Sequence, residues 1–320
     1  MTRLGYAGRR LIQMAPIVVG VTIIVFFMIH LVPGDPAQVM LGTHSDPAEV
    51  ARLHRVWGLD RPLPTQYLLF LGRLLHGNLG DSLFYRVPTA TLIAQRLPVT
   101  LWLILFAAVI SVAISVPLAT LAATKKDSLR DQVIRAIPLV GLGMPAFWVG
   151  IVLILLLGLK AGLFPVGGYG EGFLGHLDAL FLPGLTVAIS ISPLLIRSLR
   201  ASMLAILESE FVMTARSKGL RQGRVLIRHV LRNAMIPTVT ILGINISFLV
   251  GGTFVTEKVF ALPGAGSLMI AAIQTRDFSV VQGVTLVFAI LVILVNLLVD
   301  LTYSWLDPRV RLRRQRSDYV

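Results

Sequence analysis

Residues 97–124 read LPVTLWLILFAAVISVAISVPLATLAAT, which is 28 consecutive positions without a charged side chain. An α-helix rises about 1.5 Å per residue, so roughly 20 apolar residues are enough to cross the hydrocarbon core of a bilayer. This stretch exceeds that length. The sequence therefore predicts that it spans a membrane as a helix.

Five further windows also lack charged residues: 11–34, 136–159, 179–196, 233–256 and 278–299. Each is long enough to cross a bilayer, the shortest of them, 179–196, with help from its flanks. The whole chain is 55% hydrophobic and only 14% charged, whereas soluble domains carry roughly 25% charged residues. We predict an all-α integral membrane protein with six transmembrane helices.

The basic residues follow the expected sidedness of these helices. A formal net charge of +13 would also suit a nucleic-acid binder, but 20 of the 29 Lys and Arg residues fall on one side of a six-helix topology. An excess of Lys and Arg is typical of cytoplasmic segments. We therefore expect a plasma or inner membrane location with lipid contacts, cytoplasmic N- and C-termini, and no nucleic-acid partner.

Three regions are predicted along the chain. Residues 1–34 form a tail and the first helix, which resembles a signal peptide but has a longer apolar run, so we interpret it as an uncleaved helix. Residues 35–96 form an ordered extracytoplasmic region in which Asp46 caps a short helix. Residues 97–320 hold the remaining helices, a cytoplasmic loop at 197–232 and a basic tail. Segments 160–178 and 257–277 are expected to form tight external turns, because they are rich in Gly or contain Pro-Gly.

The cytoplasmic loop contains a second decisive stretch, EFVMTARSKG at residues 210–219. It lacks proline and ends on glycine, which predicts a short helix with Gly219 as its stop. Phe211, Ala215 and Gly219 recur at intervals of four and are expected on one face. The alternative is that this loop, with its eight basic residues, serves only to fix the topology.

Several motifs resemble the permease family of ATP-binding-cassette importers, and most closely its dipeptide, oligopeptide and nickel branch. The strongest are TARSKGL at 214–220 and HVLRNAMIP at 229–237, and others are GNLGDS at 77–82 and PGAG at 263–266. The resemblance runs from end to end and implies a type I importer permease fold. One departure is that Met213 and Thr214 stand where the family's coupling loop has Glu and its first Ala.

The resemblance also implies partners and site residues. Its coupling loop would contact the ATPases through Glu210, Thr214, Ala215, Arg216, Lys218, Gly219, Leu220, His229, Arg232 and Asn233. The implied partners are a second homologous permease subunit, two ATP-binding-cassette ATPase domains and an extracytoplasmic substrate-binding protein. Di- and oligopeptides would be the cargo, with nickel, glutathione or another small solute of the same branch as the alternative.

Energy would come from outside this chain. It contains no Gly-x-x-x-x-Gly-Lys-Ser/Thr motif, so ATP and Mg would be bound by partner subunits, and we expect no catalytic residue, cofactor or metal site in this chain. An ion-coupled secondary transporter is the alternative from a different class. Such a carrier would place carboxylates or histidines at mid-membrane, whereas none of the six windows contains a charged residue and His30 lies at the end of the first.

Pore or gate candidates lie in the fifth window, at Asn245, Gly251, Gly252 and Thr253. The Gly pair suits either a hinge or close helix packing, and we favour packing. Pro138 and Pro145 in the third window either kink that helix or are tolerated there without a functional reason.

Overall fold

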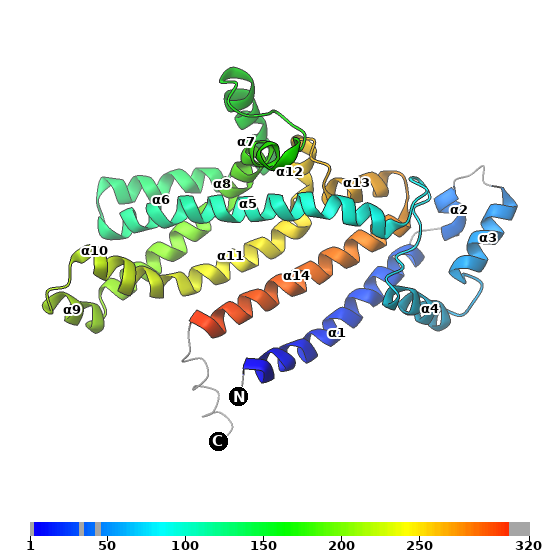
Figure 1. Ribbon diagram of the computed structural model, residues 1–320, viewed down its shortest axis with the longest axis horizontal. Helices are drawn as coiled ribbons and strands as arrows, with labels where there is room; N and C mark the ends of the chain where they lie inside the picture. Colours follow the sequence, from blue (N-terminus) through cyan, green and yellow to red (C-terminus); the bar gives the residue numbers. More distant parts are fainter. Residues whose placement is uncertain (1–2, 32–34, 42–45, 307–320) are drawn as a thin grey trace. The chain divides into compact units, whose positions relative to one another are not determined.

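The computed structural model describes residues 3–31, 35–41 and 46–306 (Figure 1). Within these residues the elements are α-helices and two π-helical segments, η1 and η2, which confirms the predicted all-α class. They divide into two compact units: unit 1 comprises residues 1–100 and 263–293, and unit 2 comprises residues 101–262 and 294–320. The basic tail at 309–316 and Pro33-Gly34 lie outside the described residues.

Unit 1 contains α1 (Arg3–His30), α2 (Pro36–Leu41), α3 (Pro47–Trp57), α4 (Leu63–Leu75), α13 (Ala265–Gln274), the start of α5 (Thr89–Thr124) and the first half of α14 (Phe278–Leu306). The Asp46 side chain caps α3 as predicted, because its Oδ1 accepts a hydrogen bond from the Ala48 N–H at 2.9 Å. The same helix ends at Gly58, whose φ of 68° lies in the left-handed region. Local sequence signals therefore set both ends of α3.

Helix α4 packs against α1. The Thr22 hydroxyl lies 2.9 Å from the Tyr67 hydroxyl, and His30 Nε2 lies 2.9 Å from Gln66 Oε1. Phe26 adds an edge-to-face contact with Tyr67, with ring centroids 5.4 Å apart. Within the described part of the region 35–96, the short helix α4 is thus tied to the first long helix.

The prediction of a tight turn over residues 257–277 is wrong. Helices α12 (Phe254–Val259) and α13 occupy most of it. Ala265, Leu268 and Ala272 are buried at helical spacing, and Thr100 Oγ1 accepts a hydrogen bond from the Ala265 N–H at 2.9 Å. The apolar period of α13, which the Pro-Gly signal obscured, therefore decides its structure.

Unit 2 is built around α8 (Gly172–Leu207), which packs with α6 (Leu129–Leu142), α7 (Ala146–Leu153) and α11 (Arg232–Gly252). Its other elements are η1 (Ile154–Lys160), α9 (Glu210–Ser217), α10 (Gln222–Arg224), η2 (Val225–Leu231) and α12. Helix α5 crosses α8 closely at Gly184, where a Cβ atom would lie 3.3 Å from the side chains of Phe106 and Ile110. Most of the apolar part of α8 is therefore buried inside this single chain.

The third window, expected to be one crossing helix, is instead broken into α6 and α7. The two directions differ by 104°, and Figure 1 shows α7 leaving the line of α6. Proline has no N–H and disfavours helical geometry in the residue before it. Pro145 accordingly stands at the N-cap of α7 with ψ 136°, so of the two outcomes left open for it, the break is the one observed.

The described residues support fewer complete spans than six. Four helices are long and apolar enough to cross: α5, α8, residues 222–252 and residues 278–299. The bent pair of α6 and α7–η1 adds a fifth if both parts count together. The apolar part of α1, Met14–His30, is about 26 Å long, slightly less than the roughly 30 Å hydrocarbon core. A multi-pass helical protein is confirmed, but the count of six is not.

Candidate functional site

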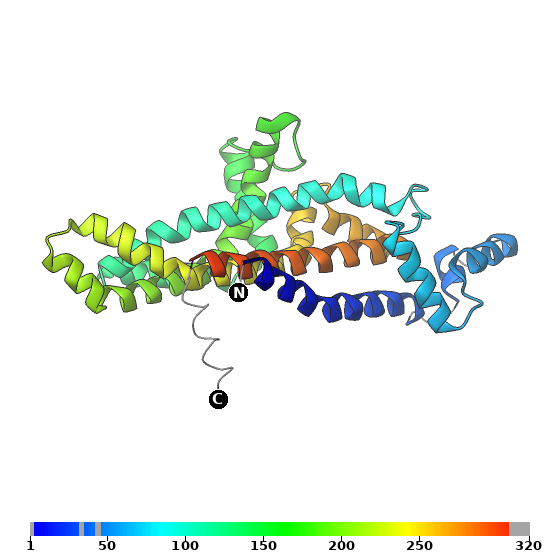
Figure 2. The same cartoon turned by 60° about the horizontal axis from the view of Figure 1, so that its bottom comes forward.

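Helix α9 is the short helix predicted in the loop at residues 197–232. It spans Glu210–Ser217 and lies at one end of unit 2, as Figures 1 and 2 both show. Gly219 follows with φ 75°, and the Leu220 N–H donates to the Ala215 carbonyl at 3.3 Å. Both the helix and its glycine stop are therefore confirmed.

One side of α9 is anchored in the core of unit 2. Val212 is fully buried and Ala215 is 8% exposed. They join a cluster that also contains Ala119, Ala123, Ile196, Leu199, Met203, Val225, Val230 and Ala234. Phe211 and Ala215 were expected on one face, with Ala215 in contact with an ATPase subunit. Within this chain Ala215 is instead buried, whereas Phe211 is exposed. The buried side is centred on positions 212 and 215, which are neighbours at i, i+3 on a helix.

The rest of the surface of α9 is exposed. Phe211 is 49% exposed and Met213 is 55% exposed, although both are large apolar residues. Thr214 is exposed as well, and its hydroxyl donates to the Glu210 carbonyl at 2.9 Å. Residues two positions apart do not share a helix face, so Phe211 and Met213 lie on opposite flanks of the buried side. Each is an exposed apolar side chain that another protein can contact.

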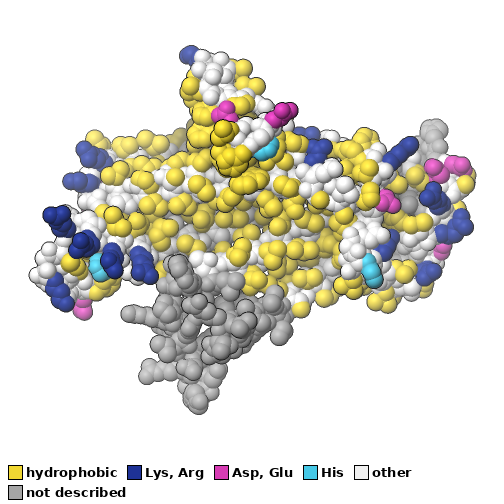
Figure 3. Space-filling view, in the orientation of Figure 1, with side chains coloured by type: hydrophobic (Ala, Val, Ile, Leu, Met, Phe, Trp, Pro, Cys, Tyr) yellow, Lys and Arg dark blue, Asp and Glu magenta, His cyan; other side chains and the backbone are white. Residues whose placement is uncertain are grey.

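The charged residues around α9 are exposed. Glu210, Arg216 and Lys218 all point into solvent, and no ion pair joins any of them to another described residue. Figure 3 shows Lys and Arg side chains gathered at this end of unit 2, next to a broad hydrophobic surface. This electropositive end suits an acidic partner surface. Glu210 as the acidic contact of the loop stays a prediction.

The second motif of the predicted coupling loop, residues 229–237, begins in η2. Because η2 packs against α9, this motif lies beside α9. Leu220 is half-buried against the same core cluster. His229 is half-buried too, and its carbonyl accepts a hydrogen bond from Asn233 Nδ2 at 2.6 Å. Arg232 and Asn233 are exposed. The structure therefore brings the two halves of the predicted coupling loop together into one surface.

The pore candidates do not belong to this surface. Asn245 lies about 20 Å along α11 from Arg232, and Gly251, Gly252 and Thr253 lie about 30 Å from it, at or just after the far end of the helix. Asn245 is half-buried and donates to the Ile241 carbonyl at 2.7 Å, and the hydroxyl of buried Thr253 lies 3.3 Å from Glu257 Oε1. The prediction that Gly251 and Gly252 serve close helix packing is wrong within this chain. A Cβ atom at either position would meet no atom within 4 Å.

A buried ion pair near this end of unit 2 was missed in the sequence. Asp131 is fully buried on α6, and Arg200 on α8 donates two hydrogen bonds of 2.6 Å to its carboxylate. Such a bidentate pair orients both helices. Its local signal is the spacing of Ser128 and Asp131, a capping pattern in which Ser128 Oγ accepts from the Asp131 N–H at 3.3 Å.

Known proteins are similar to this sequence over nearly its full length. Residues 115–312 match the family described as the binding-protein-dependent transport system inner membrane component, and residues 3–104 match its N-terminal counterpart. The dipeptide transport system permease protein DppB of Escherichia coli K12 is 36% identical, with 95% of this chain and 97% of that protein covered.

Other relatives carry related names. A putative peptide transport system permease protein of Brucella abortus is 38% identical, with 95% of this chain and 98% of that protein covered. The glutathione transport system permease protein GsiC of Pectobacterium atrosepticum is 35% identical, with coverage of 96% and 99%.

Solved structures show the same fold at low sequence identity. The MetNI methionine ABC transporter in an inward-facing conformation aligns with a TM-score of 0.57 at 16% identity, covering 68% of this chain and 96% of that chain. The two family matches together cover most of the sequence, and the relatives are more than 30% identical to it. Both findings agree with the end-to-end motif resemblance. The chain therefore belongs to the family of binding-protein-dependent transport system inner membrane components, the permease subunits of ATP-binding-cassette importers.

Proposed function

We propose that this permease lines part of the translocation pathway for di- and oligopeptides and that α9 couples it to cytoplasmic ATPase subunits. The observation that carries the coupling role is the two-sided character of α9. Val212 and Ala215 fix the helix to the core of unit 2, while Phe211 and Met213 remain exposed. A helix that is rigidly anchored on one side and docked on the other can pass rigid-body motion to spanning helices.

The proposed assembly contains a second homologous permease, two ATP-binding-cassette ATPase domains that hold ATP and Mg, and an extracytoplasmic substrate-binding protein. This permease itself would hold no cofactor. The names of its relatives support the assembly, since they belong to binding-protein-dependent transport systems. In this arrangement the termini and α9 are cytoplasmic, and the region 35–96 meets the binding protein or its cargo.

Peptides are the proposed cargo because the relatives include dipeptide and peptide permeases. The glutathione permease is consistent with this class, since glutathione is itself a small peptide. Growth of a deletion strain on single dipeptides, glutathione or nickel-limited medium separates these substrates. An ion-coupled carrier is not favoured, because no charged residue lies in the six apolar windows.

The coupling role is tested by Phe211→Ser. Phe211 is half-exposed, so the change removes apolar contact area without opening the core of unit 2. We expect the ATPase activity of the reconstituted complex to lose most of its stimulation by loaded binding protein, by roughly tenfold if Phe211 is a central contact. Ala215→Trp is a poorer test, because bulk at that buried site would disturb the chain's own packing.

Leu163→Ser is the matched control. Leu163 is 63% exposed and belongs to the same unit, but it follows η1 rather than α9. It should leave the stimulated ATPase rate near that of the wild type. Both variants could instead keep the wild-type stimulation of ATPase activity while both proteins are present in the membrane. That result would show that the loop is only a basic topogenic segment.

A further inference from the structure

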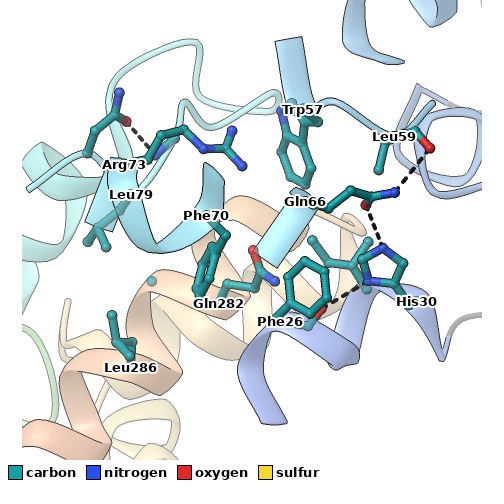
Figure 4. Close-up of a pocket in the computed structure, with 14 residues that line it drawn as sticks. Phe26, His30, Trp57, Leu59, Gln66, Phe70, Arg73, Leu79, Gln282 and Leu286 are labelled. Atoms are coloured by element: carbon teal, nitrogen blue, oxygen red, sulfur yellow. Dashed lines mark hydrogen bonds between the residues drawn. The ribbon is translucent and has the colours of Figure 1, made fainter. Parts of the chain in front are cut away.

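Unit 1 contains a small pocket that the transport role does not use. It is formed by α1, α3, α4, α14 and the segments that follow α3 and α4, all within unit 1 (Figure 4). Its apolar wall consists of Phe26, Ile29, Trp57, Phe70, Leu79 and Leu286. Its free volume is about 40 Å³, far below the roughly 300 Å³ of pockets for drug-sized ligands. The pocket therefore accepts one small chemical group rather than a whole peptide.

Most polar atoms in the pocket are already satisfied within the protein. Gln66 donates to the carbonyls of Leu59 and Arg61, and its Oε1 lies 2.9 Å from His30 Nε2. Gln282 Nε2 donates to the Val25 carbonyl at 2.8 Å. These groups shape the pocket, and little donor capacity remains on them for a ligand.

Arg73 is the exception. Its guanidinium is half-buried, and Cζ lies 5.8 Å from the centroid of the Trp57 ring, beside which Figure 4 shows it. No hydrogen bond or ion pair joins its side chain to another described residue. Burial lowers the pKa of Arg73 from its ordinary value. A buried charge is normally paired with an opposite charge, so a partly buried cation without an anionic partner is a candidate site for binding an anion.

A second donor lies nearby, and no negative charge competes. Asn78 Oδ1 accepts from the Gly80 N–H at 2.8 Å, so its Nδ2 remains available. None of the fourteen lining residues is acidic. The donor set therefore selects an oxyanion, and the apolar wall favours one that is carried on an amphiphile.

The position of the pocket indicates which amphiphile this is. His30 ends the apolar segment of α1, and the same helix exposes Ile24 and Phe27. Helix α4 likewise exposes Leu68, and Leu75 at its end is 86% exposed. Trp57 and Tyr67 are the aromatic type that is enriched at the membrane interface. The pocket thus lies where an apolar helix surface meets the polar region 35–96, which is the level of lipid headgroups.

We propose that this pocket binds the phosphate of an anionic membrane phospholipid, with Arg73 as the charged donor and Asn78 as the second donor. Acyl chains of the lipid would lie along the exposed apolar surface of α1. Arg is suited to this task because its planar fork matches two phosphate oxygens at once. The bound lipid would hold α4 against α1 and so support the region 35–96.

The test uses the full-length chain in a non-ionic detergent, with Trp102, Trp148 and Trp305 replaced by Phe so that fluorescence reports Trp57. Titration with dioctanoyl phosphatidylglycerol should give a saturable change. Arg73→Gln should weaken binding at least about tenfold, whereas Arg73→Lys should weaken it less. Arg52→Gln, an exposed arginine on α3, should bind like the wild type.

Parallel titrations separate the sources of the anion. Inorganic phosphate binding as tightly as the lipid would overturn the lipid assignment, and competition by dialanine would replace it with a cargo carboxylate. Binding that is unaffected by Arg73→Gln would overturn the site itself. If Arg73→Gln fails to give a cooperative thermal unfolding transition, Asn78→Ala carries the test, and an unchanged affinity in that variant would count against the proposal.

Discussion

Gly219 shows how one residue can set the geometry of the proposed coupling surface. Its φ of 75° is strained for a residue with a side chain, although a Cβ atom there would meet no other atom within 4 Å. We expect Gly219→Val to cost about 1–2 kcal/mol through backbone strain alone and to misplace α9. Thermal unfolding of the purified chain and ATPase stimulation of the complex measure the two effects.

Gly223 is the matched control for Gly219. It is also exposed with open space around it, but it lies in α10 and its φ is not positive. Gly223→Val should therefore change stability by only a few tenths of a kcal/mol, because no left-handed conformation is lost. A similar loss in both variants would contradict the assignment of Gly219 as a conformational stop.

At the scale of elements, His54 ties α3 to the chain on either side of it. Its Nε2 lies 2.8 Å from Asp35 Oδ2, and its Nδ1 lies 3.2 Å from Asp60 Oδ1. The hydrogen bond to Asp35 raises the pKa of His54 above 6.5, against the opposing effect of burial, and Asp60 adds to the rise. Because the folded pKa is raised, this stabilisation is complete below about pH 6.5 and is lost as pH rises through the folded value.

We therefore expect the amides of α3 to lose protection from hydrogen exchange between pH 6 and pH 9, after correction for intrinsic rates. His54 is about one-third exposed, so the effect should be about two- to fivefold, as for an exposed ion pair. His54→Gln should abolish this pH dependence, and α4 should serve as the internal reference. A pH dependence that persists in His54→Gln would rule out this link.

At the scale of the whole molecule, the charge distribution makes a topology prediction. The chain contains no cysteine, so single cysteines can be introduced without background labelling. A membrane-impermeant maleimide should label Arg61→Cys and Ala161→Cys from outside intact cells. It should label Arg130→Cys and Ser217→Cys only after the membrane is opened. Reversal at two or more of these exposed sites would refute the proposed sidedness.

The sequence alone was sufficient for features that depend on neighbouring residues. Charge-free runs indicated the helical membrane class because hydrocarbon excludes charge over about 20 residues. Asp46 and Gly219 marked helix ends because caps and stops are closed by backbone groups a few positions away. The family motifs are likewise contiguous stretches. These predictions did not require knowing which helices pack against one another.

Only the tertiary structure decided which surfaces are buried and which distant side chains meet. In α9 the apolar residues 211, 212, 213 and 215 surround the helix, so the sequence does not say which side faces the core. Whether Pro145 bends its helix depends on the packing of its neighbours. Asp131 and Arg200 are 69 positions apart, and the pocket that holds Arg73 is lined by residues of four helices. Such features arise from long-range packing, which replaces water around a side chain with residues that its own segment does not contain.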